Sequence, residues 1–184
     1  KLGREIVLNE TIGDIQLLQC FDIKNCHFFN EKDIFAPYKF EETQFHFDKR
    51  VFRTEDHTDF KGYFQTEKYF EHCKDKVRES FTFREEIQER ANNWIEPYKQ
   101  YNLVSLHVRR TDYVSNSANH PPCPLSYYEE SLKKFDSEIP VMIFSDDVGW
   151  CKCQDLFSSD RFLISENNWN IADLCLMSLC SHHI

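Results

Sequence analysis

Residues 103–113 read LVSLHVRRTDY and decide the fold of the C-terminal half of the chain. The first six residues form a short, mainly apolar run, which predicts a buried strand of a parallel sheet. The end of this strand brings together an imidazole, two guanidiniums and a carboxylate, from His107, Arg109, Arg110 and Asp112. Each guanidinium is planar and permanently charged, and it can hold phosphate oxygens bidentately. The arginine pair therefore suits an anion with two charged centres, and a pyrophosphate is the obvious candidate.

Strands and helices alternate from this stretch to the end of the chain. Apolar runs predict strands over 103–108, 140–144 and 161–164, and a further strand is expected to begin after Cys180. An amphipathic helix is expected after each of the first three strands, and the third of these helices covers about 170–180. This alternation is typical of a parallel, doubly wound α/β sheet.

Two polar clusters follow the first two predicted strands. The arginine motif comes after the first strand, and Ser145-Asp146-Asp147 comes after the second. In open α/β sheets, ligands bind at the carboxyl ends of the strands. We therefore expect both clusters to lie on the same rim of the sheet.

The N-terminal half carries weaker patterns. Residues 21–60 are aromatic and charged without a sustained period, which predicts loops and short strands. A helix is expected over 66–78, and a capping box at Thr82-x-x-Glu85 predicts a second helix. Helical spacing of apolar residues ends before Pro97.

A domain boundary is expected just after that second helix, within Pro97–Asn102. The prediction is an incomplete N-terminal, acceptor-side domain over 1–98 and an incomplete C-terminal α/β domain over 99–184. Residues 1–3 resemble the end of a helix, ahead of a short strand over 5–8. Both ends look interrupted, so the chain is expected to be an internal fragment.

The composition limits the partners that the chain can have. Charged residues make up 29% and the formal net charge is −9, which argues against nucleic acid and anionic lipid as general partners. No apolar stretch approaches the roughly 20 residues that span a bilayer, and no secretory signal is recognisable. A soluble, cytoplasmic protein is the favoured expectation; a Golgi-lumenal parent with an anchor outside this sequence is the alternative.

Eight scattered cysteines favour reduced thiols over a disulfide framework, although an oxidising compartment would reverse this preference. A zinc site is an alternative, because thiolates and imidazoles are the usual zinc ligands. The candidate ligands are Cys151, Cys153, Cys180, His182 and His183. Their spacing departs from the usual Cys-x2-Cys pattern, and Cys153 is expected on the apolar face of a helix, so buried thiols are the favoured interpretation.

Residues 107–113 resemble the His-x-Arg-Arg-x-Asp-Tyr motif of the inverting α-1,2-fucosyltransferases, glycosyltransferase family eleven. Three further segments agree with that family in the same order. They are GYFQTEKYF at 62–70, FSDD at 144–147 and DLCLMSLCSHHI at 173–184. Four ordered matches are far more specific than an arginine pair alone.

The resemblance implies a two-domain, GT-B-like nucleotide-sugar transferase whose C-terminal part is a truncated Rossmann-like sheet. It implies GDP-L-fucose as donor, a galactoside hydroxyl as acceptor, α-1,2 linkage and no required metal or cofactor. Arg109 would be the main β-phosphate ligand, with Arg110 supporting the pyrophosphate or the geometry of the motif. His107 would lie near phosphate and ribose, and Asp112 and Tyr113 would hold the arginines and shape the pocket.

The Ser145-Asp146-Asp147 cluster has two interpretations. An aspartate after a strand is a common helix N-cap, and one of the pair is expected to serve as one. A carboxylate can also accept hydrogen bonds from the ring N–H and the exocyclic amine of guanine together, and adenine lacks that donor pair. We assign guanine reading to Asp146 in preference to Asp147, within a substrate-binding cluster that includes Ser145.

Aromatic residues gather around the 62–70 segment, and they also have two interpretations. They could form a platform for stacking a sugar, or they could pack together in the core, which is the safer prediction. The residues are Phe60, Tyr63, Phe64, Tyr69 and Phe70.

The chain departs from the family in lacking a Gly-Gly-Leu-Gly-Asn-Gln turn and an Asn-Ser-Ser-Phe-Ser-Trp-Trp segment, which are expected before Lys1 and after Ile184. This polypeptide alone is therefore expected to be nearly inactive. Its general base is not assigned, since Asp112 and the acidic residues after Phe144 are candidates by proximity only. Two alternatives stay open: another GDP-sugar transferase, such as a protein O- or core fucosyltransferase, and a non-catalytic glycan- or nucleotide-binding module.

Overall fold

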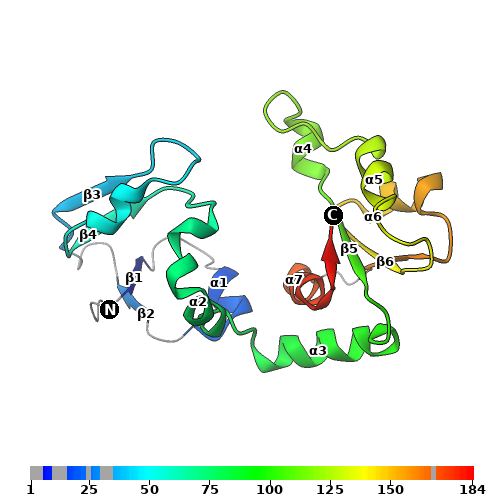
Figure 1. Ribbon diagram of the computed structural model, residues 1–184, viewed down its shortest axis with the longest axis horizontal. Coiled ribbons are helices and arrows are strands. Elements are labelled where there is room, and N and C mark those ends of the chain that lie inside the picture. Colours follow the sequence, from blue (N-terminus) through cyan, green and yellow to red (C-terminus); the bar gives the residue numbers. More distant parts are fainter. Residues whose placement is uncertain (1–5, 10–15, 24–25, 30–34, 167–168) are drawn as a thin grey trace. The chain divides into compact units, whose positions relative to one another are not determined.

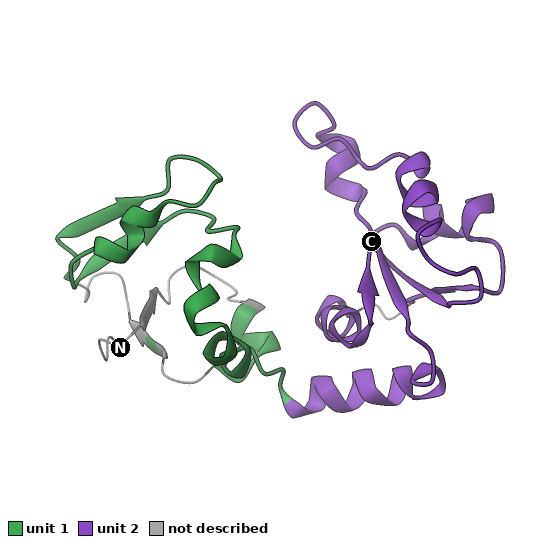
Figure 2. Ribbon diagram, in the orientation of Figure 1, with its two compact units in different colours: residues 1–84 green, residues 85–184 purple. Residues whose placement is uncertain are grey.

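The structure is a computed structural model that describes residues 6–9, 16–23, 26–29, 35–166 and 169–184 (Figure 1). The chain divides into two compact units, Lys1–Arg84 and Glu85–Ile184 (Figure 2). The predicted helix end at residues 1–3 lies outside the described residues.

The first unit is built from short elements. The strands form two parallel pairs, β1 (Ile6–Asn9) with β2 (Cys26–Phe29), and β3 (Tyr38–Glu41) with β4 (Thr58–Lys61). The helices are α1 (Gln16–Cys20) and α2 (Lys74–Ser80). The helix expected over 66–78 is wrong in its first part, where two short 3-10 turns precede α2. Short strands and loops over 21–60 are confirmed among the described residues.

The second unit holds a four-stranded parallel sheet in the order β7-β6-β5-β8. Its strands are β5 (Val104–Val108), β6 (Val141–Ser145), β7 (Phe162–Ile164) and β8 (His182–His183). Its helices are α3 (Glu85–Ile95), α4 (Thr111–Ser115), α5 (Leu125–Leu132), α6 (Val148–Lys152) and α7 (Asn170–Leu179). The prediction of an α/β fold with a parallel sheet is confirmed.

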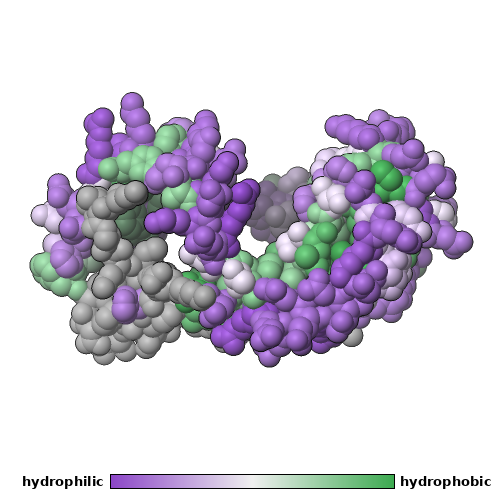
Figure 3. Space-filling view, turned by 60° about the horizontal axis from the view of Figure 1, so that its bottom comes forward, coloured by the Kyte–Doolittle hydropathy of each residue, from purple (hydrophilic) through white to green (hydrophobic). Residues whose placement is uncertain are grey.

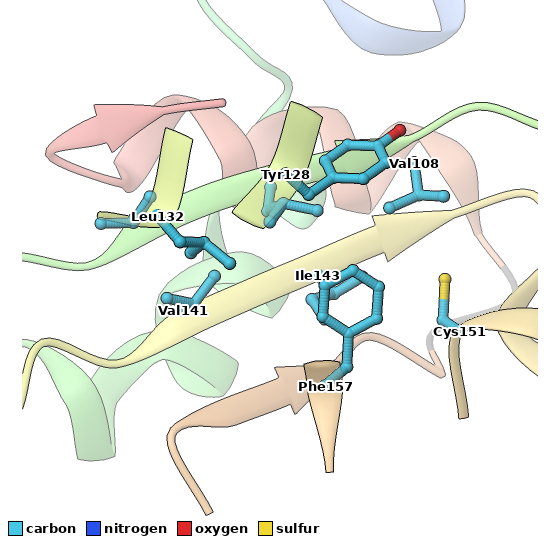
Figure 4. Close-up of a cluster of buried hydrophobic side chains, with 9 residues drawn as sticks. Val108, Tyr128, Leu132, Val141, Ile143, Cys151 and Phe157 are labelled. Carbon is cyan, nitrogen blue, oxygen red and sulfur yellow. The ribbon is translucent and has the colours of Figure 1, made fainter. Parts of the chain in front are cut away.

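Side chains alternate between the two faces of this sheet, and both faces are covered. On one face, Val108 and Ile143 pack with Tyr128 of α5, Cys151 of α6 and Phe157 (Figure 4). On the other face, α3 packs against α7, the helix that precedes β8 in the chain (Figure 1). Strands buried on both faces are expected to be almost entirely apolar. This explains why β5 and β6 were recognisable in the sequence.

The helix α3 shows why the second unit starts before the predicted boundary. Ile87, Ala91 and Ile95 are buried on one side of α3, which packs against α7 of the same unit. The other side of α3 is hydrophilic (Figure 3). The boundary between the two compact units therefore lies between residues 84 and 85 in the sequence. The division into acceptor-side and sugar-nucleotide-side domains at 98/99 stays a prediction.

Two details of the predicted helices are wrong. Thr82 is not the N-cap of α3, because α3 begins only at Glu85; the Thr82 hydroxyl donates to the carbonyl oxygen of Glu79 at 2.9 Å. The sequence Ser126-x-x-Glu129 predicts a capping box for the helix after the first strand, yet Ser126 lies inside α5, whose N-cap is Pro124.

The thiols are distributed differently from the prediction. Cys153 is exposed, and Cys151 is the buried thiol of α6. Seven cysteines are free thiols, namely Cys20, Cys73, Cys123, Cys151, Cys153, Cys175 and Cys180. Burial raises the pKa of Cys180 to about 11 and also raises those of Cys151 and Cys175.

The described residues contain neither a candidate metal cluster nor a candidate membrane span. No group of three or more His, Cys, Asp or Glu side chains in this part of the chain could hold a metal ion. Among the same residues, no helix has both the length and the apolar character needed to cross a membrane.

Candidate functional site

The carboxyl ends of β5 and β6 bring the two polar clusters together. Val108, the last residue of β5, pairs with Ser145, the last residue of β6. The arginine motif and the aspartate pair therefore leave the sheet side by side on one rim, as the sequence predicted. Several hydrogen bonds then join the two segments.

The strand order places a topological switch point at β5. The chain moves from β5 to β6 and β7 on one side, and then returns to β8 on the other side of β5. Beyond β8, the backbone N–H of His107 donates to the carbonyl oxygen of Ile184 at 3.0 Å. Ligands of doubly wound sheets bind outside the carboxyl ends of the strands at such a point. His107 and Arg109 are the neighbours in sequence of Val108, the last residue of β5.

Arg109 presents a partly exposed guanidinium at this rim. Its Nε and Nη2 atoms donate to the two carboxylate oxygens of Asp112, both at 2.8 Å. Its side chain remains 49% exposed. The Tyr113 ring centroid lies 5.9 Å from the guanidinium carbon. Arg109 is therefore oriented by its neighbours and still reachable from solvent.

Arg110 has a more enclosed environment. Its guanidinium carbon lies 3.9 Å from the centroid of the Trp150 ring, and its Nε donates to Asp147 Oδ2 at 3.2 Å. Asp147 also caps α6 by accepting from the backbone N–H of Trp150 at 3.0 Å. The side chain of Arg110 is 19% exposed. The two adjacent arginines thus differ: one faces solvent, and the other is held against α6.

Asp146 binds the backbone that follows β5. Its Oδ1 accepts from the Arg110 N–H at 2.8 Å, and its Oδ2 accepts from the N–H and the hydroxyl of Thr111 at 3.1 and 2.5 Å. Partial burial acts to raise the pKa of Asp146, but these hydrogen bonds outweigh it, so the pKa lies below its usual range. The carboxylate is therefore held in its charged form.

His107 alternates along β5 with the buried Leu106 and Val108, so it lies on the opposite face of the sheet, where it is exposed. Desolvation by its surroundings lowers the pKa of His107, while the charge of Asp146 acts to raise it. Lowering favours the neutral imidazole, which can both donate and accept a hydrogen bond. The same face holds a contact between the buried hydroxyl of Ser105 and His183 Nδ1 at 2.7 Å.

Three contributors at this rim were missed by the sequence reasoning. Thr111 supplies two donors to Asp146, Trp150 stacks on Arg110, and His120 stacks on Tyr113 at 5.4 Å between ring centroids. A signal existed for Trp150, because it lies three residues after the N-cap Asp147 and thus at the start of α6. No local pattern pointed to Thr111.

The aromatic residues of the first unit form ring contacts with one another. Phe64 lies 5.3 Å from Tyr69 and 6.5 Å from Phe60, measured between ring centroids. Tyr63 is 73% exposed and contacts Phe45 at 5.4 Å. Ring packing therefore accounts for part of this cluster, although Phe60, Tyr63 and Phe70 are exposed and the other two rings are only partly buried.

The fold and the rim place the chain among the α/β proteins whose ligands bind at the carboxyl ends of parallel strands. Residues 24–184 match the family model described as glycosyl transferase family 11. The chain therefore belongs to glycosyltransferase family 11, and the resemblance seen in its motifs is confirmed.

Two relatives come from Escherichia coli. An α-1,2-colitosyltransferase is 38% identical over 135 residues, which cover 68% of this chain and 46% of the relative. The O-antigen biosynthesis glycosyltransferase WbnK is 29% identical over 136 residues, which cover 67% of this chain and 45% of the relative. The chain thus spans about half the length of these relatives. No solved structure matches it.

Proposed function

We propose that the chain forms the diphosphate grip of an inverting α-1,2-glycosyltransferase that transfers L-fucose from GDP-L-fucose to a galactoside hydroxyl. The observation that carries this proposal is the oriented, half-exposed guanidinium of Arg109 beside the switch point of the sheet. Membership of family 11 and the α-1,2 linkage in the name of one relative support it.

The transfer reaction needs positive charge beside the bond that breaks in the donor. The acceptor oxygen attacks the anomeric carbon as the bond from that carbon to the phosphate oxygen breaks, and a base takes the proton of the hydroxyl. Negative charge grows on the departing GDP, and a guanidinium already in place stabilises the transition state more than the ground state. Arg109 supplies that guanidinium in this proposal.

The neighbouring residues take supporting roles. Arg110, fixed by Trp150 and Asp147, steadies the motif beside the diphosphate. The neutral imidazole of His107 contacts the phosphate or ribose, and Tyr113 shapes the pocket. Guanine reading by the Ser145-Asp146-Asp147 cluster stays a prediction.

The organisation of the whole enzyme is also part of the proposal. Residues 1–98 belong to the acceptor side and residues 99–184 to the GDP-sugar side of a GT-B-like architecture. The general base is not assigned, and Asp112 and the acidic residues after Phe144 are candidates by proximity. We also propose that this polypeptide alone turns over little or no donor. A cytoplasmic location is expected because the two relatives are bacterial.

One observation favours a second donor. The relative that is 38% identical is named for colitose rather than fucose. Transfer assays that offer the two nucleotide-activated sugars side by side distinguish these donors. Preference for the colitose donor would correct the sugar and leave the diphosphate grip in place.

The central test is Arg109→Ala in the full-length protein that carries this sequence. Loss of one preorganised donor typically costs about 10² to 10³ in rate, and we expect a fall of that size in transfer from GDP-fucose. Arg78→Ala is the matched control, since Arg78 also forms an exposed ion pair with an aspartate three residues away. Near-normal transfer by Arg109→Ala would overturn the proposal.

Titration of GDP, ADP and UDP against the same protein tests the nucleotide. GDP binding without transfer or hydrolysis would instead identify a non-catalytic binding module. Transfer to protein hydroxyls or to core glycan, with none to galactosides, would identify another class of fucosyltransferase.

A further inference from the structure

We propose that Asp146 is a positioning residue, which fixes the backbone turn that carries the arginines and does not read the nucleobase. The inference rests on the proposed diphosphate site, because it concerns how Arg109 is presented there. It assigns Asp146 a role different from the one expected from sequence.

The carboxylate of Asp146 is already occupied by the protein. Its two oxygens accept hydrogen bonds from both the Arg110 and Thr111 backbone N–H groups and from the Thr111 hydroxyl, at 2.5 to 3.1 Å. A fourth neighbour, Arg109 Nε, lies 3.6 Å from Oδ2. A carboxylate offers about four lone-pair sites. Guanine would need a site on each oxygen, and Oδ2 already accepts two hydrogen bonds, so reading guanine would require at least one of the Thr111 contacts to break.

The residues on either side of Asp146 also clamp β5 to β6. The Ser145 hydroxyl donates to the carbonyl oxygen of Val108 at 2.8 Å and accepts from the Asp147 N–H at 2.9 Å. Asp147 in turn holds the side chain of Arg110. Consecutive residues after β6 therefore fix consecutive residues after β5.

This clamp acts where the chain changes direction. Arg110 has φ −135° and ψ −56°, outside regular helical values, and α4 begins at the next residue. The amides of Arg110 and Thr111, held by Asp146, fix that change of direction. Arg109 lies directly before it, so its guanidinium is aimed by the same contacts. Displacement of a catalytic group by about 1 Å can cost 10²-fold in rate.

The test compares ligands with and without a base. Inorganic pyrophosphate, GDP and ADP are titrated against the full-length protein and its Asp146→Asn variant, in which an amide N–H₂ replaces one acceptor and faces backbone donors. We expect pyrophosphate and GDP to lose affinity by the same factor, up to about a hundred-fold, with the preference for GDP over ADP retained. Unchanged pyrophosphate binding with loss of that preference would show that Asp146 reads guanine, and would overturn the inference.

A second variant keeps the test informative if Asp146→Asn fails to fold. Thr111→Val removes one hydroxyl donor and leaves the carboxylate in place. Positioning predicts weaker pyrophosphate binding and a lower kcat, whereas guanine reading predicts no change in either. Asp160→Asn, an exposed aspartate in the same unit, is the control and should leave all affinities unchanged. Wild-type protein that binds neither pyrophosphate nor GDP would instead reject the proposed function itself.

Discussion

Two carboxylates, one in each compact unit, make nearly the same set of hydrogen bonds. Asp146 binds two consecutive backbone N–H groups and the Thr111 hydroxyl. Glu42 accepts from the N–H groups of Tyr63 and Phe64, both at 2.8 Å, and from the Tyr69 hydroxyl at 2.7 Å. Each therefore fixes a turn of the backbone through a single side chain.

What surrounds the two carboxylates differs. Asp146 follows β6, whose residues Val141 to Phe144 are buried, so its turn rests on a rigid apolar layer. Around Glu42, by contrast, Phe64 and Tyr69 are only partly buried and Tyr63 is 73% exposed. The Asp146 turn is therefore supported by a dense core in the second unit, whereas the Glu42 turn in the first unit is supported by partly exposed rings. A precise site is expected on the rigid support.

The largest effect should come from the core beneath the Asp146 turn. Ile143→Ala removes a fully buried side chain, and we expect a loss of about 2–5 kcal/mol in the free energy of unfolding of the second unit. Hydrogen exchange read by mass spectrometry should show the loss in β5 and β6 and little change around Glu42. Leu174→Ala, at a 45% exposed position on α7, is the control. Equal loss of protection from exchange in both units would contradict the idea that each turn is supported by its own unit alone.

A pair of glycines should give the next largest effect. A Cβ added to Gly62 would lie 2.6 Å from the Glu42 Cβ, so Gly62→Ala should displace the Glu42 turn and cost about 1–3 kcal/mol. The corresponding change in the second unit, Gly149→Ala, meets only Asp147 Oδ1 at 4.0 Å and lies in α6. Because alanine favours helix, it should be neutral or stabilising. Faster amide exchange of Tyr63 and Phe64 in Gly62→Ala would support displacement of the Glu42 turn. A Gly62→Ala variant as stable as the wild type would contradict it.

Lowering the pH should have the smallest effect on the free energy of unfolding, and it should destabilise both units. The pKa of Glu42 is lowered by the hydrogen bond from Phe64 first and by Tyr69 next, and the pKa of Asp146 is lowered by Thr111 and Arg110 against the opposing effect of burial. Both groups favour the ionised form when folded. Their contribution to stability is thus fully present above the unfolded values, about 4.3 and 3.9, and is lost as pH falls below them.

Amide chemical shifts of Tyr63, Phe64, Arg110 and Thr111 would follow this acid titration by NMR. Glu42→Gln and Asp146→Asn should each remove the pH dependence at their own turn alone. A turn that keeps its titration after its carboxylate has been replaced would show that another group holds it.

The sequence predicted the second unit better than the first, for physical reasons. Strands buried on both faces have apolar runs, and an aspartate after such a strand suggests an N-cap, which Asp147 is. The partner of Asp146 could not be inferred, because it depends on the register between β5 and β6. The Glu42 contacts were missed because their partners lie 21 to 27 residues away.

The arrangement of the sheet has a consequence for biosynthesis. β5 is an interior strand, yet one neighbour, β8, comes from residues 182–183. As the chain leaves the ribosome, β5 can pair with β6 early, but its other edge keeps unpaired N–H and C=O groups until β8 has been made. Such an edge is a template for pairing with other chains. Until β8 has been made, this edge of β5 is therefore open to pairing with a strand of another chain.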